Sequence, residues 1–186
     1  MSGLRSKSEE VSWGWYKMIK NSTDLREITK PFLEEFDTFC REYGLVGKVK
    51  ADHIGLKCSS KELYESQRSF FEFESRFVYQ SIISKRRISI VGLTEGLVTS
   101  VGLLNYLELS DQKPDGSQKD AVDHLEIVPV RISFQELVDD LQSKKVMLRE
   151  TIKPHHTTHD IVLSSGFIVK LSQEMLINKI KREEMV

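Results

Sequence analysis

The chain has 186 residues, of which 39% are hydrophobic and 30% are charged, and its formal net charge is −1. This balance is ordinary for a globular protein; it includes no long basic run that would favour nucleic acid and no stretch of roughly 20 apolar residues that would cross a membrane. The two cysteines lack a metal-type spacing and the first ten residues are too polar for a secretory signal, so we expect a cytoplasmic protein, monomeric or homodimeric.

Residues 1–48 are expected to form an N-terminal helical extension. Asp24, followed three residues later by Glu27, has the pattern of a helix start. Pro31 falls inside the apolar pattern and should split or bend the helix, because proline lacks the amide hydrogen that a helix interior uses. Further along, an aromatic stripe recurs at helical spacing and should face the core. Its members are Phe32, Phe36, Phe39, Cys40 and Tyr43.

Two longer stretches, residues 49–111 and 121–172, show the same order of predicted elements. In the first, a strand at 50–58 precedes a helix at 61–75 and strands at 77–83, 86–93 and 102–110. In the second, a strand at 121–130 precedes a helix at 134–144 and strands at 146–152, 159–163 and 167–171. A polar segment, 111–120, joins the two stretches, and residues 173–186 should form a C-terminal helix. This order predicts an α+β protein of two paired βαβββ modules in one compact domain.

Two short motifs each occur twice, once in each stretch. The sequence DHIGL begins at Asp52, and DHLEI begins at Asp123. Because successive side chains of a strand point to opposite faces, each copy places a histidine, His53 or His124, on the polar face of a half-buried strand. The sequence YLELS at 106–110 is likewise similar to IVKLS at 168–172. Two motifs repeated in matching order indicate a duplicated unit.

Packing of the two halves about a pseudo-two-fold axis would bring four polar side chains together, namely His53, Glu108, His124 and Lys170. Two histidines and a carboxylate are a common ligand set for a divalent metal, with positions left open for a substrate. We therefore predict that His53, Glu108 and His124 bind one divalent ion: Zn, Ni, Mn or Fe(II). The alternative is that both histidines are hydrogen-bonded residues of the core.

Lys170 and Glu126 are the candidates for catalytic roles. Lys170 would pair with Glu108 and abolish metal binding, neutralise an anionic substrate, or act as a base if its pKa is lowered. Glu126 lies on the same strand face as His124, and Lys57 on the same face as His53. Each of these two side chains either lines the substrate pocket or is exposed to solvent at a strand end.

His156 and His159 are the remaining candidates for the substrate pocket. They follow Pro154, and this proline argues against a helix at residues 154–160. We expect a loop at the pocket mouth, which would bring both histidines near the substrate. The alternative is that His155 and His159, four residues apart, bind the metal as a pair.

The repeated motifs resemble those of the vicinal oxygen chelate superfamily, which includes glyoxalase I. The stretch YLEL at 106–109 followed by DHLEI at 123–127 looks like the fourth-strand glutamate and fifth-strand histidine of that superfamily. The stretches ADHIGLKC at 51–58 and HLEIV at 124–128 resemble its YecM-like branch, and the resemblance covers residues 25–174. One position departs from the pattern, since the eighth-strand glutamate of glyoxalase I corresponds to Lys170.

This resemblance implies a cupped mixed sheet and a metal-dependent enzyme that acts on a small, oxygen-rich substrate. Isomerase, lyase and oxygenase chemistry are all compatible with it, but a lysine at position 170 argues against ordinary glyoxalase activity. The alternative is a small-molecule binding module, metal-free or metal-stabilised, that keeps the fold without catalysis.

Overall fold

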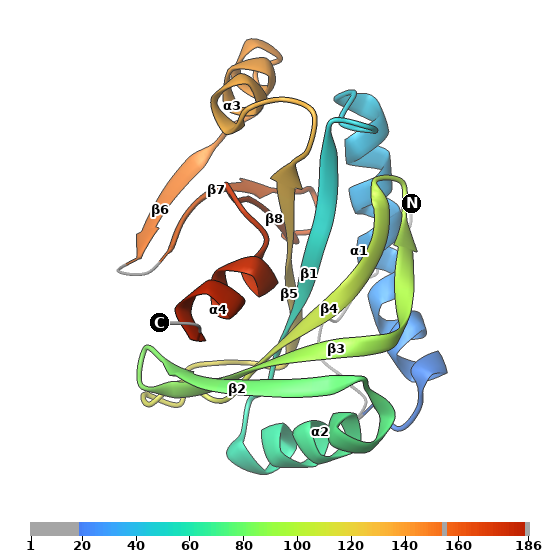
Figure 1. Cartoon of the computed structure of the whole chain (residues 1–186), viewed down its shortest axis with the longest axis vertical. Coiled ribbons are helices and arrows are strands. Elements are labelled where there is room, and N and C mark those ends of the chain that lie inside the picture. Colours follow the sequence, from blue (N-terminus) through green and yellow to red (C-terminus); the bar gives the residue numbers. More distant parts are fainter. Residues whose placement is uncertain (1–18, 154–155, 185–186) are drawn as a thin grey trace, which may run out of the picture.

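The computed structural model describes residues 19–153 and 156–184 (Figure 1). The described part contains four helices: α1 (Ser22–Glu42), α2 (Lys61–Glu74), α3 (Phe134–Ser143) and α4 (Leu176–Glu184). It also contains eight strands: β1 (Val49–Lys57), β2 (Phe77–Ile83), β3 (Arg86–Thr99), β4 (Gly102–Ser110), β5 (Ala121–Pro129), β6 (Arg149–Lys153), β7 (His156–Val162) and β8 (Ile168–Leu171).

The eight strands form one mixed sheet in the order β2-β3-β4-β1-β5-β8-β7-β6. Its two halves mirror each other, because β1 pairs in parallel with β4 and β5 pairs in parallel with β8. The halves meet where β1 and β5 run antiparallel. The predicted α+β fold of paired βαβββ modules is therefore confirmed, with the pseudo-two-fold axis between β1 and β5.

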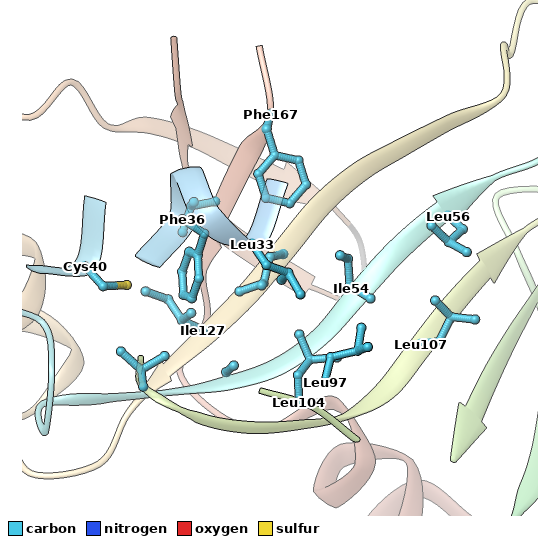
Figure 2. Close-up of a cluster of buried hydrophobic side chains, with 14 of the residues drawn as sticks. Leu33, Phe36, Cys40, Ile54, Leu56, Leu97, Leu104, Leu107, Ile127 and Phe167 are labelled. Carbon is cyan, nitrogen blue, oxygen red and sulfur yellow. The ribbon is translucent and has the colours of Figure 1, made fainter. Parts of the chain in front are cut away.

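One face of the central strands is apolar and carries the core. The register places Ile54 beside Leu107 and Leu125, and none of the three is exposed to solvent. Figure 2 shows Leu33 and Phe36 of α1 against this layer. Since strand side chains alternate between faces, burial of this apolar layer leaves the opposite face for the polar residues of the repeated motifs. Figure 1 shows α4 within the curve of the sheet, between β6–β8 and β2.

Helix α1 differs from the prediction in its start and at Pro31. Asn21, rather than Asp24, is the N-cap, because its side chain accepts the Asp24 amide at 2.9 Å. Asp24 instead lies in the first turn and accepts the Lys20 amide. Pro31 does not split the helix, which runs through it. The lost hydrogen bond is outweighed by one continuous buried face that includes Leu25 before the proline and Phe36 after it.

The second half departs most from the predicted boundaries. Strand β6 begins at Arg149, later than predicted, and β7 begins at His156. The strand predicted from residue 159 is therefore present, paired with β6 and β8, but it starts three residues earlier, so residues 156–158 are not the predicted loop at a pocket mouth. The early start of β7 is explained by its threonines and other residues that favour strands, which can pair with both β6 and β8. In the described part, no helix is both long and apolar enough to cross a lipid bilayer.

Candidate metal centre

Paired irregularities in β1 and β5 shape the site. The register between these strands shifts by one residue between Ala51 and Ile54, where the extra residue lies on β1. It shifts again between Gly55 and Leu56, where the extra residue is Asp123 of β5. Bulges re-aim side chains and are common beside functional sites. The two bulges follow the pseudo-two-fold axis, so each Asp-His motif has the same local distortion.

His53 lies at the centre of the cluster and is 2% exposed. Its Nδ1 atom is 3.1 Å from Asp52 Oδ2, which also accepts the backbone amide of Leu176 at the start of α4. Its Nε2 atom is 3.8 Å from Glu108 Oε2 and 4.0 Å from Glu126 Oε2. Both distances exceed a hydrogen bond, and Nε2 is buried without a hydrogen-bond partner. Asp52 therefore fixes one ring nitrogen and leaves the other facing two carboxylates.

His124 repeats this arrangement across the axis. Its Nδ1 atom is 3.0 Å from Asp123 Oδ2, and Asp123 also forms an ion pair with Lys57. The rings of His53 and His124 meet edge to face, with centroids 5.5 Å apart. Gly55 makes room for this ring, since a Cβ at that position would overlap the His124 imidazole. A carboxylate that holds Nδ1 and leaves Nε2 for a ligand is the usual support of metal-binding histidines.

Two serines hold the two glutamates in the same way. Ser110 Oγ donates to Glu108 Oε1 at 3.1 Å, and Ser172 Oγ donates to Glu126 Oε1 at 2.6 Å. In each glutamate, Oε2 is the oxygen that lies nearer His53. Glu126 is 2% exposed, whereas the Glu108 side chain keeps 21% of its surface exposed. Access to the cluster is therefore greatest on the Glu108 side.

The charges of the cluster shift its ionisation. Burial lowers the pKa of His53, but the negative charges of Glu126, Asp52 and Glu108 outweigh burial and raise that pKa to about 9. Burial raises the pKa of Glu108, and the imidazoles of His124 and His53 outweigh it, so this pKa lies below its usual value. For Asp123, burial is likewise outweighed, first by His124 and then by Lys57, and its pKa is lowered.

The residues present fit a divalent metal ion. One ligand-type atom from each of His53, Glu108 and His124 lies within 4.8 Å of the other two. A second set with the same property is Asp52, His53 and Glu126. Imidazole nitrogens with carboxylate oxygens are the donor types that Zn, Mn, Ni and Fe(II) accept. The buried Nε2 of His53 without a hydrogen-bond partner is the specific feature that a metal would explain.

Lys170 of β8 lies beside Glu126 of β5 in the strand register, but its side chain forms an ion pair with a residue of β7. Its Nζ atom is 3.6 Å from Asp160 Oδ2 of β7. Thr151 and Thr158 donate hydrogen bonds to the same carboxylate. One predicted alternative paired Lys170 with Glu108, whereas the ion pair in the structure is with Asp160, a residue that the sequence did not single out.

The histidines predicted for the substrate pocket are placed differently. Asp160 and Lys170 are register partners and share one face of the sheet, so His159, next to Asp160, points to the other face. There its ring contacts Phe134 at the start of α3, with centroids 5.4 Å apart. The structure therefore does not bring His159 to the cluster. His156 begins β7, but its side chain and all of His155 lie outside the described residues.

Sequence reasoning overlooked the residues that support the ligands, although the repeats contained the signal. Both histidines follow an aspartate, and each aspartate holds the adjacent ring. Both copies of the second motif end in serine, and Ser110 and Ser172 each hold a glutamate. Repetition at matching positions could have found these residues. Asp160 had no such signal, because it stands outside the repeated motifs.

Comparisons with known proteins agree with this architecture. The family described as YecM protein matches residues 21–180. The structural-genomics protein EC4020 is 18% identical, with a TM-score of 0.62 over 91% of this chain and 100% of that one. A hydroxyglutarate synthase from Oryza sativa, solved in complex with 2-oxoadipate, is 10% identical, with a TM-score of 0.50 over 84% of this chain and 81% of the enzyme. No curated protein matches the chain.

At these identities the solved structures support the fold, whereas the family match spans most of the sequence. The residues matched include both Asp-His motifs and both strands that end in the supporting serines. The chain belongs to the YecM family, and its paired βαβββ modules share the fold of the protein EC4020.

Proposed function

We propose that this protein is a metal-dependent enzyme of the vicinal oxygen chelate type that acts on a small, oxygen-rich substrate. His53, Glu108 and His124 would hold one divalent ion: Zn, Ni, Mn or Fe(II). The observation that carries the proposal is the buried Nε2 atom of His53, which has no hydrogen-bond partner and faces the carboxylate of Glu108 at 3.8 Å. When bound, the ion would supply a Lewis acid for substrate oxygens, which serves isomerase, lyase or oxygenase chemistry.

The chain's own residues would prepare the site. Asp52 and Asp123 hold the Nδ1 atoms of the two histidines, which directs the Nε2 atoms inward. Lys57 reaches the site only through its ion pair with Asp123, so its predicted role in the pocket becomes one of orienting His124. Asp160 already pairs with the Lys170 ammonium, so an anionic substrate group would have to compete with that carboxylate for the lysine.

Metal content and titration test the proposal. Protein purified without a histidine tag should contain a stoichiometric divalent metal by elemental analysis. After chelation, calorimetric titration with the same metal should show a binding event that His124→Ala abolishes. A complete ligand set can give an apparent binding energy of ~10 kcal/mol or more, and this variant removes one of three ligands. His159→Ala is the matched control and should bind like wild type, since His159 packs on Phe134. Unchanged affinity in His124→Ala would place the metal elsewhere.

One observation favours the second candidate, a binding module without a metal-dependent reaction. The raised pKa of His53, about 9, keeps a positive charge among Glu126, Asp52 and Glu108 at neutral pH. This positive charge offsets part of the negative charge of the three carboxylates without an ion. If this candidate is right, untagged protein will contain no metal, and adding Zn, Ni, Mn or Fe(II) will leave its melting temperature unchanged.

A further inference from the structure

The two halves of the site carry their carboxylates at non-equivalent positions. In the first half, Glu108 of β4 stands beside Gly55 of β1. In the second half, the equivalent pair is Lys170 of β8 beside Glu126 of β5. The pseudo-two-fold axis therefore relates Glu108 to Lys170 and Gly55 to Glu126. Each half therefore has one of the two glutamates, on the outer strand of the pair in the first half and on the central strand in the second.

Steric and charge constraints explain why each carboxylate lies where it does. Position 55 cannot carry a side chain without displacing the His124 ring. Position 170 carries a lysine, which Asp160 holds at 3.6 Å on the side away from β5. The lysine therefore supplies no ligand from β8, and the glutamate of that half is Glu126 of β5.

Glu126 also has the geometry of Glu108. A serine that ends a repeated motif holds Oε1 of each glutamate, Ser172 for Glu126 and Ser110 for Glu108. The Oε2 atoms lie at 4.0 and 3.8 Å from the same atom, the buried Nε2 of His53. The two glutamates are thus held by the same kind of hydrogen bond and lie at nearly the same distance from His53 Nε2, although they come from non-equivalent strands. This similarity indicates that both would bind an ion placed at that nitrogen.

Resting on the proposed metal site, we propose that Glu126 is a fourth protein ligand, which replaces the carboxylate that strand β8 lacks. Ligand atoms about 2.0–2.2 Å from an ion lie roughly 3 Å apart when they are neighbours. The 3.8 and 4.0 Å separations therefore require both glutamates to move inward when the ion binds. Glu126 lies within 4.8 Å of Asp52 and His53, in a set separate from that of Glu108 and His124, so binding the shared ion would draw it toward the latter set.

Co(II) binding distinguishes a ligand from a proton acceptor at Glu126. Untagged protein, stripped with a chelator, is titrated with Co(II) while its visible absorption and X-ray absorption report affinity and the number of coordinating atoms. Glu126→Gln should weaken binding by more than about 100-fold, beyond the 10- to 100-fold typical of supporting residues, and change the Co(II) spectrum. Glu126→Asp should also weaken binding, because it keeps the charge but retracts the carboxylate by one methylene.

Controls and opposing outcomes are specific to this inference. Glu62→Gln, at an exposed position in the first turn of α2, should bind like wild type. Circular dichroism and unfolding curves establish that each variant folds. If wild type binds Co(II) and both Glu126 variants match it in affinity and spectrum, Glu126 is not a ligand although the metal site stands. If wild type binds no Co(II), Zn or Mn, the metal site and the fourth ligand are both overturned.

Discussion

At the scale of single residues, His53 decides how the cluster behaves without a metal. It is surrounded by Asp52, Glu108 and Glu126, and its pKa is raised to about 9. In an unfolded chain the pKa is about 6.5. Because the folded value is higher, the stability that His53 contributes is fully present below about pH 6.5 and is lost as the pH rises through about 9.

The metal-free protein should therefore lose stability between about pH 6.5 and 9. Each unit of pKa difference corresponds to ~1.4 kcal/mol, so the loss should be on the order of 3 kcal/mol. Urea unfolding in a chelating buffer, repeated at half-unit steps of pH, measures it. The series ends at pH 9 because of the two buried cysteines. Burial raises the pKa values of Cys40 and Cys58 to about 12, so at higher pH these thiols also reduce the stability of the folded protein and would mask the effect of His53. A flat profile, or an equal slope in His53→Gln, would contradict the assignment.

At the scale of elements, the bulges and α4 position the histidines. The extra residue in each strand lets an aspartate turn toward the adjacent ring. Asp52 has a further task that Asp123 lacks, because its carboxylate accepts the Leu176 amide at 2.8 Å and so joins β1 to the start of α4. Asp123 instead pairs with Lys57. The C-terminal helix is thereby linked to one histidine and not to the other.

Asp52→Ala and Asp123→Ala form a matched pair that separates these roles. Each should lower metal affinity by about 10- to 100-fold, since each removes the partner that orients a ligand. Only Asp52→Ala should increase hydrogen exchange at the Leu176 amide, because only Asp52 accepts that hydrogen. Equal exchange in the two variants would mean that α4 is held by its apolar contacts alone, and wild-type affinity in both would show that the aspartates do not orient the rings.

At the scale of the whole molecule, the pseudo-two-fold axis makes one site from two halves. β1 and β5 cross the axis side by side, so a side chain of one half ends against the backbone of the other. The clearest case is Gly55 of β1, where the absence of a side chain admits the ring of His124 from β5.

Gly55→Ala should therefore damage the metal site without unfolding the protein. The new methyl group would displace the His124 ring, and calorimetric titration should show weaker metal binding by about 10-fold or more, as for other changes that misorient a ligand. Gly96→Ala is the control, because its Cβ would likewise meet a side chain, that of Leu103, which is not part of the cluster. It should alter stability and leave affinity unchanged. Equal affinity in both variants would argue against His124 as a ligand.

Much of this architecture follows from the sequence, because the hydrophobic pattern has a two-residue period in the strands and repeats in two halves. Strands β2 and β4 have their predicted bounds, and α2 and α3 begin where predicted because Ser60 and Ser133 cap them through local chemistry. The predicted split of the helix at Pro31 and the predicted loop before His159 were wrong for one reason. Burial along the rest of α1 outweighs a local breaker, and pairing with β6 and β8 turns an apparent loop into a strand.

The sequence by itself determined the duplicated fold and the candidates His53, Glu108 and His124, because similar motifs in matching order place the two histidines on equivalent strands and Glu108 on a strand of the repeat. The cytoplasmic location and the oligomeric state of the protein stay predictions. Only the tertiary structure decided which partners these side chains meet. Asp160 forms an ion pair with Lys170, and Ser172 donates a hydrogen bond to Glu126. Gly55, which has no side chain, leaves space for the ring of His124. These contacts join strands far apart in the chain, and a strand's own pattern specifies its faces but not the neighbours that it meets there.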